Sequence, residues 1–350
     1  MRDVAIIASA QAVNTATTTA TPVEMLIPVV NQVLANAGMA RSDIGFWCHG
    51  SCDYMTGQPF SFVSAVDALG AWPPIIESHV EADGAFALYE AWMKIQTGEV
   101  DTALVFGNGR SSSGDINRIL TLQLDPYVVG PLWPDDRSIA AMQARACLEA
   151  GVITERAMAQ IAARNHHNAL TNPVALRRGE HSVEQLLAAP LVASPLRELD
   201  CPAHSDGVTA VIIAAGDRAR SLRARPAWIR GIDHRIESQN LGNRSMTTLP
   251  SAVIAAQKAG VANDKIDVAE LHAPYTHQEL LLTAALGLGE STSINPSGGA
   301  LCANPMMSAG LARFAEAAAR IMDGSADRAL GHASSGPWLQ QNLVCVLEGE

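Results

Sequence analysis

The sequence lacks the features that usually mark a nucleic-acid-binding or membrane-bound chain. Its 350 residues carry a net charge of −11 but contain no block of like charges. That distribution argues against a nucleic-acid-binding surface and against a polybasic segment that binds a membrane surface. No apolar run reaches the roughly 18 residues that a membrane-spanning helix needs. We therefore expect neither nucleic acid nor a membrane among the partners.

Signals for export and for disulfide bonding are also missing. The N-terminus, MRDVAIIASAQ, has no basic region before a long apolar one, so we interpret it as a strand and not as a signal peptide. The six cysteines are scattered without a disulfide framework, which is typical of a reducing cytoplasm. A hydrophobic content of 48% allows a large buried core. The composition predicts a soluble, cytoplasmic α/β protein.

Short apolar strands alternate with helical segments in the first third of the chain. The expected strands are residues 4–8, 44–48, 73–78 and 102–106, and the expected helices are residues 23–37, 60–69 and 84–98. Such alternation predicts a mostly parallel sheet covered by helices. A region with a long helical pair and no β alternation follows, and the strand pattern resumes near residue 208.

The chain contains an internal repeat. The segment GAFALYEAWMKIQTGEVDTALVFG, which starts at Gly84, matches GLARFAEAAARIMDGSADRALGHA, which starts at Gly310. A second pair of segments superposes Gly38 on Gly260. Two such halves, related by a pseudo-twofold axis, bury their long helices between two sheets. The C-terminal ends of strands from both halves then face one shared cavity.

Several motifs, taken in order and spacing, resemble the thiolase superfamily. They are LDCPAHSDGVTAVIIAA, ELHAPYTHQEL, INPSGGALCANP and the final Gly-rich strand hairpin. The nearest branch is that of the thiolase-like lipid-transfer proteins, relatives of the sterol-carrier-protein type. The resemblance implies a five-layered αβαβα fold. Its N-terminal half would be residues 1–110, with 201–220 returning to its sheet, its helical loop domain 111–200 and its C-terminal half 221–350.

The departures from that family concern its catalytic thiols. Thiolases carry a nucleophilic cysteine at the N-terminus of a buried helix, where the helix dipole and a nearby base lower the thiol pKa. Here the matching segment is ESHVEADG, and Glu81 takes the place of the cysteine unless the alignment shifts by one residue. Asn304 replaces the histidine of the family's GHP motif. The terminal segment GHASSGPW lacks the second catalytic cysteine, and we expect His332 there to titrate in a suitable range for acid–base chemistry.

One polar residue of the family's site is retained, namely His272. The resemblance implies that His272 polarises the thioester carbonyl and that Asn304 supplies a second donor. Together they would stabilise an enolate without covalent catalysis, which suits retro-aldol cleavage of a β-hydroxyacyl-CoA with a bulky acyl group such as a sterol side chain. Acyltransferase-like chemistry is the related possibility. The alternative is a catalytically silent subunit that carries lipid or acyl-CoA, or supports a paralogous thiolase.

The resemblance also implies partners. We expect a homodimer or a heterodimer with a thiolase-like subunit, and a companion subunit of OB-fold and zinc-ribbon architecture. Coenzyme A enters as part of the substrate, and we expect no other cofactor and no metal.

Each candidate residue also has a purely structural interpretation. His272 would then end a strand, Asn304 would precede a proline in a turn, and Glu81 would be an acid at a helix start. His332 and Cys302 would simply be buried, although Cys302 also resembles a displaced nucleophile. Three further features have a structural interpretation: Tyr275 as a packing aromatic, the string CHGSC at 48–52 as a strand end and not a metal site, and Gly107-Asn108-Gly109 as a tight strand exit.

Overall fold

The computed structural model describes residues 1–14, 19–57 and 59–350, apart from the side chain of Asn14. Two five-stranded groups form its sheet. The first group has the order β3-β2-β4-β7-β1 and the second has the order β10-β9-β12-β13-β8. The strands of the first group are β1 (Val4–Asn14), β2 (Phe46–Gly50), β3 (Glu77–Val80), β4 (Thr102–Arg110) and β7 (His204–Ala215). Those of the second are β8 (Ala227–Ile236), β9 (Val268–Leu271), β10 (Ser293–Ile294), β12 (Arg328–Ser335) and β13 (Gln341–Glu348).

The same strand order therefore occurs twice. In each group the last strand in sequence, β7 or β13, is antiparallel to both of its neighbours, one of which is the first strand of that group. The other strands of each group pair in parallel, so the sheet is mixed and not mostly parallel as predicted. The groups meet where β1 and β8 pair, with Ala5 opposite Trp228. This arrangement is the one that the internal repeat predicts.

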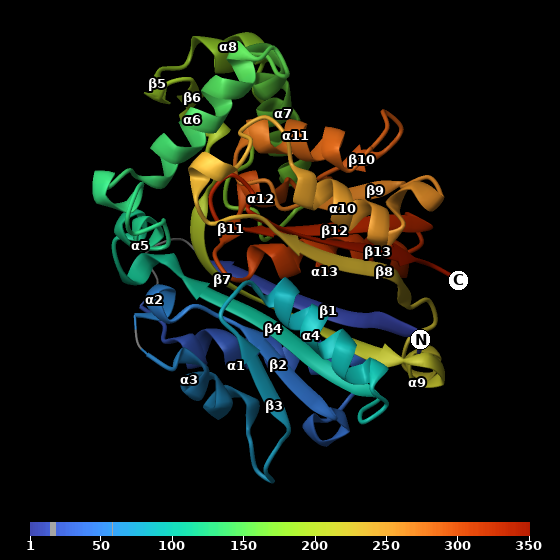
Figure 1. The fold of residues 1–350 in the computed structure, drawn as a ribbon. Coiled ribbons are helices and arrows are strands. Elements are labelled where there is room, and N and C mark those ends of the chain that lie inside the picture. The colour runs from blue at the N-terminus through green and yellow to red at the C-terminus, as the bar shows by residue number, and fades with distance from the viewer. Residues whose placement is uncertain (15–18, 58) are drawn as a thin grey trace.

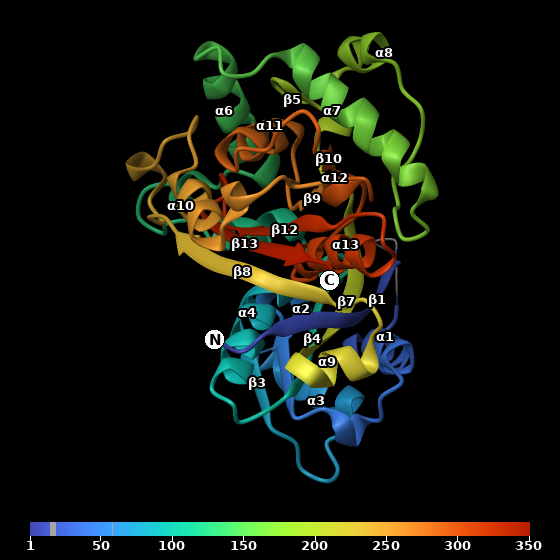
Figure 2. The ribbon, with the colours of Figure 1, turned by 90° about the vertical axis from the view of Figure 1, so that its right-hand side faces the viewer.

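Helices form three layers around the two strand groups (Figures 1 and 2). The helices α4 (Gly84–Gln96) and α13 (Ala309–Met322) lie between the groups and contribute to one shared core. The helices α1 (Pro22–Ala37) and α3 (Ser61–Leu69) cover the outer face of the first group. The helices α10 (Pro250–Ala259) and α11 (Thr276–Ala285) cover the second. The predicted five-layered αβαβα fold is confirmed.

Local sequence signals set the ends of the equivalent helices. Thr21 caps α1, its side chain accepting the Glu24 N–H, and Pro22 occupies the first helical position, where its missing N–H costs nothing. The helices α1 and α10 both end on glycine in the left-handed region, with φ +64° at Gly38 and +75° at Gly260. These are the glycines that the repeat superposes.

Most of the region 111–200 stands above the second half, whereas its first helix lies beside the first half, next to residues 53–56 (Figure 1). It contains α5 (Ile116–Leu122), α6 (Asp136–Glu149), α7 (Glu155–Asn168) and α8 (Val183–Ala188). It also contains a two-stranded hairpin, β5 (Leu191–Ala193) and β6 (Leu196–Arg197), which the sequence pattern did not indicate. The chain then returns through β7, which pairs with β1 and β4. The domain boundaries themselves stay a prediction.

Several predicted segment limits are wrong. The first strand continues to Asn14 instead of ending at residue 8, because β7 pairs along its whole length. Gly107-Asn108-Gly109 is not a strand exit, since all three residues lie inside β4. A Cβ at Gly107 would lie 2.3 Å from the Met307 carbonyl oxygen, and one at Gly109 would lie 1.7 Å from that of Met306. Glycine is needed there because the segment after β11 (Asn304–Pro305) crosses β4.

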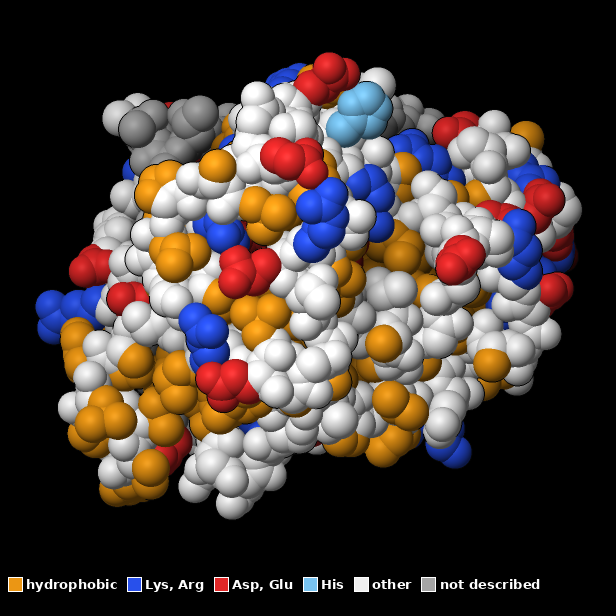
Figure 3. Space-filling view, turned by 90° about the horizontal axis from the view of Figure 1, so that it is seen from above, with side chains coloured by type: hydrophobic (Ala, Val, Ile, Leu, Met, Phe, Trp, Pro, Cys, Tyr) orange, Lys and Arg blue, Asp and Glu red, His pale blue; other side chains and the backbone are white. Residues whose placement is uncertain are grey.

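The face seen from above carries acidic and basic side chains interspersed, without a patch of one sign (Figure 3). Among the described residues, none of the helices is long and apolar enough to cross a membrane.

Candidate functional site

A cavity opens where the ends of β9, β11 and β12 meet the loop region above them. Its volume is about 110 Å³. Part of its wall is an apolar cluster that includes Leu124, Ile139 and Trp338. The polar residues that line it include Asp83, Asp136, His204, His272, Gln278, Asn304 and Ser334.

The structure brings His272 and Asn304 together, side by side on the cavity wall. The Nε2 of His272 lies 3.1 Å from Oδ1 of Asn304, and its Nδ1 lies 3.0 Å from the Ser334 hydroxyl. With the proton on Nε2, the imidazole donates to Asn304 and accepts from Ser334. The only contact found for Nδ2 of Asn304 among the described residues is Sδ of Met306, at 3.8 Å. An amide N–H of Asn304 is therefore free for a ligand.

His272 is neutral in this setting. Burial, the largest influence, lowers the pKa of His272, while the charge of Asp83 and the hydrogen bond with Asn304 oppose that effect. A neutral imidazole donates from one nitrogen only. His272 therefore orients the Asn304 amide, so that the two side chains do not act as independent donors to one oxygen.

The prediction for Glu81 is corrected by the structure. Glu81 is exposed, and its carboxylate accepts the backbone N–H of Asp53 at 2.8 Å, so it does not line the cavity. The residue that reaches the cavity from the start of α4 is Asp83, two positions later. The alignment missed it because the chain turns sharply between β3 and α4, with Asp83 as the N-cap.

Asp83 is held by the N-termini of both central helices. It is buried, and its carboxylate accepts the backbone N–H groups of Ala85, Gly310 and Leu311, each at 2.9 Å. Anions are favoured at helix N-termini by the dipole and by unpaired N–H groups. A fixed carboxylate thus joins the starts of α4 and α13 at the edge of the cavity.

His332 does not lie in the cavity. It is fully buried in β12, where its Nε2 lies 3.0 Å from Oδ1 of Asn342. Burial lowers the pKa of His332 to about 3, so the ring is neutral at pH 7. Its carbonyl accepts the backbone N–H of His272 at 3.2 Å. His332 therefore supports the strand end behind His272, and its predicted acid–base role has no support in this geometry.

Cys302 fits its structural interpretation. It is buried, and its thiol donates to the Asn165 carbonyl at 3.4 Å. Burial raises the pKa of Cys302 to about 12, so almost no thiolate is present at pH 7. All six cysteines are buried, and none of them lines the cavity.

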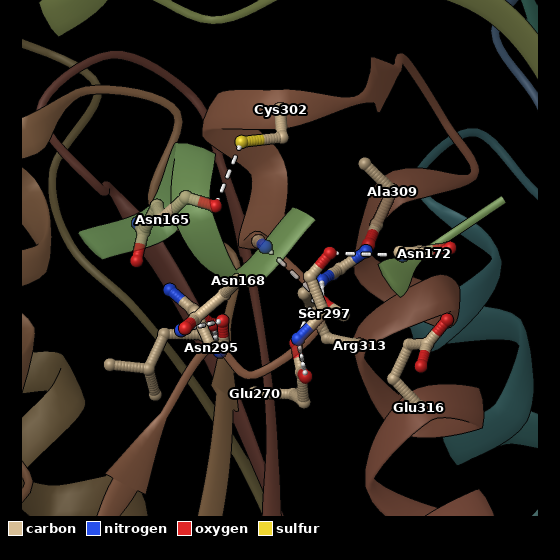
Figure 4. Close-up of polar contacts among 12 residues, drawn as sticks. Asn165, Asn168, Asn172, Glu270, Asn295, Ser297, Cys302, Ala309, Arg313 and Glu316 are labelled. Carbon is tan, nitrogen blue, oxygen red and sulfur yellow. Dashed lines mark hydrogen bonds and ion pairs between the residues drawn. The ribbon is translucent and has the colours of Figure 1, made fainter. Parts of the chain in front are cut away.

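A buried polar network holds the Asn295-to-Gly299 turn against β9 (Figure 4). The Glu270 carboxylate accepts from the backbone N–H of Ser297 at 3.0 Å and from its hydroxyl at 2.7 Å. It also pairs with the Arg313 guanidinium at 2.7 Å, and both side chains are almost fully buried. Glu270 lies two residues before His272, so the network fixes the strand that presents the imidazole.

The same turn is tied to the loop region. Asn295 accepts the Leu271 N–H at 2.7 Å, and its own carbonyl accepts from the Asn168 amide at 3.0 Å. The Asn172 amide donates to the Ser297 carbonyl at 2.9 Å (Figure 4). The turn thus links the end of α7 to the end of β9. These hydrogen bonds explain why the turn is so polar although it lies outside the cavity.

Sequence reasoning also missed Asp136, His204 and the polar contact of Tyr275. Tyr275 is buried as predicted, but its hydroxyl also donates to the carboxylate of Asp136. His204 begins β7 and lies opposite Asn304 in the β7–β11 pairing. The available signal for His204 was its position directly before the Ser205-Asp206 string. Within the described part of the chain, no group of three or more His, Cys, Asp or Glu side chains is placed to hold a metal ion.

Comparisons with known proteins agree with this architecture. No protein-family model matches the chain. It is 27% identical to an acetyl-CoA acetyltransferase of Methanothermobacter thermautotrophicus, over 69% of this chain and 70% of that protein. It is 25% identical to sterol carrier protein 2 of Gallus gallus, over 89% of this chain and only 64% of that protein.

A solved structure described as an Ltp2-ChsH2(DUF35) aldolase has the same fold. It superposes with a TM-score of 0.81 over 99% of this chain and 97% of that chain, at 20% identity. The chain therefore has the thiolase-like fold, and it is similar in sequence to thiolases and to sterol carrier protein 2.

Proposed function

We propose that the protein binds an acyl-CoA thioester in this cavity and cleaves or forms a carbon–carbon bond next to the thioester without a covalent acyl-enzyme. One observation carries the proposal: the Asn304 amide is oriented by His272 and has a free N–H on the cavity wall. A donor fixed in this way suits the oxygen of a thioester as it becomes an enolate. Coenzyme A enters as part of the substrate, and no other cofactor is proposed.

The residues present support an aldol-type reaction in preference to thioester exchange. Thioester exchange needs a thiolate, and none of the six cysteines lines the cavity. In a retro-aldol step the bond between the α and β carbons breaks, and its electron pair moves onto the thioester as an enolate. The Asn304 N–H would stabilise that charge, while the apolar wall at Leu124, Ile139 and Trp338 favours a bulky apolar acyl group. The name aldolase of the structural neighbour supports this choice.

The test is turnover of β-hydroxyacyl-CoA and β-ketoacyl-CoA panels by the purified protein, alone and with companion subunits. We expect shortened acyl-CoA and a carbonyl product from β-hydroxyacyl-CoA. Replacing Asn304 by Asp removes the N–H at nearly constant shape and is expected to lower kcat about 10²- to 10³-fold. His272→Ala frees the amide to rotate and is expected to give a similar loss. His167→Gln, an exposed histidine of α7, is the matched control and keeps full activity.

The second candidate is a silent subunit that binds acyl-CoA and supports a paralogous thiolase. The fixed Asp83 carboxylate favours it, because three backbone N–H groups leave it little freedom to act as a base. Tight acyl-CoA binding without turnover, with or without a companion subunit, would contradict the enzyme proposal and support the silent subunit. An acyl-cysteine adduct in mass spectra would contradict both, since each assumes that no nucleophilic thiol remains.

Association with a second chain is part of the proposal. We propose a dimer with a second copy or with a thiolase-like subunit, together with a companion protein. The name of the neighbouring aldolase, which joins two proteins, supports the companion. Copurification of the protein with the products of adjacent genes, followed by measurement of the mass of the complex, tests this point.

A further inference from the structure

A second polar group lies in the same cavity and takes no part in holding the Asn304 amide. It consists of His204, Asp136 and Tyr275, which come from the first residue of β7, the first residue of α6 and the residue before α11. All three line the cavity. Segments far apart in the sequence therefore meet here around two titratable groups and a phenol.

His204 lies directly beside the amide that faces the thioester. The strands β7 and β11 pair in parallel with His204 opposite Asn304. The backbone N–H of Asn304 donates to the Ala203 carbonyl at 3.0 Å. Neighbouring strands lie about 4.8 Å apart, and residues paired in this way project to the same face. Both side chains do line the cavity. His204 therefore lies about one strand spacing from Asn304.

The imidazole of His204 is incompletely paired. Its Nδ1 is buried, and no hydrogen-bond partner for that atom exists among the described residues. Leaving a buried polar nitrogen unpaired costs free energy.

Asp136 supports the imidazole electrostatically. Its carboxylate accepts the Tyr275 hydroxyl. Burial, the main cause, raises the pKa of Asp136, whereas the Tyr275 hydrogen bond and His204 lower it. Burial is also the main cause that lowers the pKa of His204; Asp136 and Glu198 oppose this, and Arg137 and Arg177 add to it. The imidazole is neutral near pH 7 and can accept a proton.

We propose that His204, assisted by Asp136 and Tyr275, binds the oxygen on the β carbon of the acyl chain and exchanges a proton with it. This inference rests on the proposed function and names its substrate class, a β-hydroxyacyl thioester. The thioester oxygen and the β oxygen are separated by three carbons, a span comparable with the distance between adjacent strands. The two oxygens can thus be held at once by Asn304 and His204.

The step balances without any external oxidant or reductant. His204 takes the proton of the β hydroxyl, the C–O bond becomes C=O, and the bond between the α and β carbons breaks. Its electron pair forms the enolate held by Asn304. Return of the proton from His204 to the α carbon restores the thioester, so the products are a ketone or aldehyde and a shortened acyl-CoA. His204 is the catalytic base, and Asp136 and Tyr275 are positioning residues.

Binding tests the inference independently of turnover. Affinities for 3-hydroxyoctanoyl-CoA and octanoyl-CoA, measured by calorimetry, differ only through the β oxygen. We expect the hydroxylated ligand to bind about tenfold more tightly to the wild-type protein, as one buried hydrogen bond allows. His204→Leu should reduce this ratio to about one while the affinity for octanoyl-CoA stays the same. Asp136→Asn should give an intermediate ratio, and the exposed His167→Gln should leave it unchanged.

The outcomes separate the two proposals. An equal affinity of the wild-type protein for both ligands, or a ratio that survives His204→Leu, overturns the role of His204 even if the protein turns over. A ratio that His204→Leu abolishes supports it even if no turnover is found, in which case only the proposed reaction fails. If His204→Leu does not fold, as judged by gel filtration, Asp136→Asn decides by the same ratio. Where turnover occurs, His204→Gln should lower kcat at least 10²-fold and remove the acidic limb of the pH profile.

Discussion

In the second half of the molecule, Glu270 of β9 and Arg313 of α13 form a buried ion pair, whereas the equivalent positions of the first half hold Cys48 and Ala87. The equivalence follows from the strand pairings and from the repeat. Both halves have the same strand order, so the ion pair is not needed to build this topology. It belongs instead to the turn that holds the end of β9, and hence to the site.

A second difference lies at the end of the same strands. His272 corresponds to Gly50 in the first half, where a Cβ would lie 2.5 Å from the Gly84 backbone nitrogen. The first half thus keeps its strand end small so that the chain bearing Asp83 can pack against it, while the second half uses its strand end to present an imidazole. The same fold therefore has a tightly packed strand end in the first half and a polar strand end that lines the cavity in the second half.

The largest test of this comparison removes the arginine of the buried pair. Arg313→Ala should lower the free energy of unfolding by about 3–5 kcal/mol, because it leaves the Glu270 carboxylate buried without a counter-charge. Urea denaturation at pH 7 measures the loss. Burial is the main cause that raises the pKa of Glu270. The folded state therefore binds more protons than the unfolded state above pH 4.5. The loss in the free energy of unfolding caused by Arg313→Ala should shrink as the pH falls.

The control for that experiment copies the first half. The double variant Glu270→Cys with Arg313→Ala carries the residues found at Cys48 and Ala87 and leaves no buried charge. It should recover most of the stability lost in Arg313→Ala. A double variant as unstable as the single one would show that the pair is required by the fold of the second half.

The next largest effect is expected at Asp83. Asp83→Asn replaces one carboxylate oxygen by an NH2 group, which cannot accept a hydrogen bond. At least one of the N–H groups of Ala85, Gly310 and Leu311 then loses its partner. We expect a loss of about 1–3 kcal/mol in the free energy of unfolding. Glu81→Gln is the matched control on the same loop and should leave the denaturation midpoint unchanged. If both variants are equally unstable, the carboxylate does not hold the two helices as described.

Buried histidines should make the second half sensitive to acid. Burial lowers the pKa of His277 and of His332 to about 3 each. Between pH 6.5 and those values the unfolded state binds more protons, so stability falls as the pH falls. Each of these histidines should cost up to about 1.4 kcal/mol per pH unit, or about 2 kcal/mol between pH 6.5 and 5. Denaturation at both pH values should show a smaller loss for His277→Gln, while the exposed His167→Gln keeps the wild-type slope.

The sequence predicted the fold because the repeat and the caps are local signals. Equivalent glycines at 38 and 260 both end helices, and a shared apolar pattern places α4 and α13 between the sheets. The pairing of His272 with Asn304 was also predictable, since both close known motif segments. How these two side chains interact was not predictable, because the tautomer of His272 depends on Ser334, which lies 62 residues away in the sequence.

Asp83, His204 and Asp136 escaped prediction although they line the cavity. Asp83 was missed because an alignment cannot say which carboxylate of the acidic loop turns inward, and only the packing of two helix ends decides it. His204 and Asp136 were missed because the strand β11 that lies beside His204 is only two residues long. Contacts between distant segments settle such positions, and local patterns do not encode them.

The smallest expected effect tests whether the halves obey the same local rules. Gly38 and Gly260 both adopt left-handed backbone at the end of equivalent helices, so Gly38→Ala and Gly260→Ala should each lower the free energy of unfolding by about 1 kcal/mol. A Cβ at Gly38 meets nothing within 4 Å, whereas one at Gly260 would lie 2.5 Å from the Asn263 amide nitrogen. That side chain is long enough to move, so the second loss should exceed the first only slightly. Paired urea titrations measure both losses, and a stable Gly38→Ala beside a strongly unstable Gly260→Ala would mean that the halves share their topology but not their local backbone energetics.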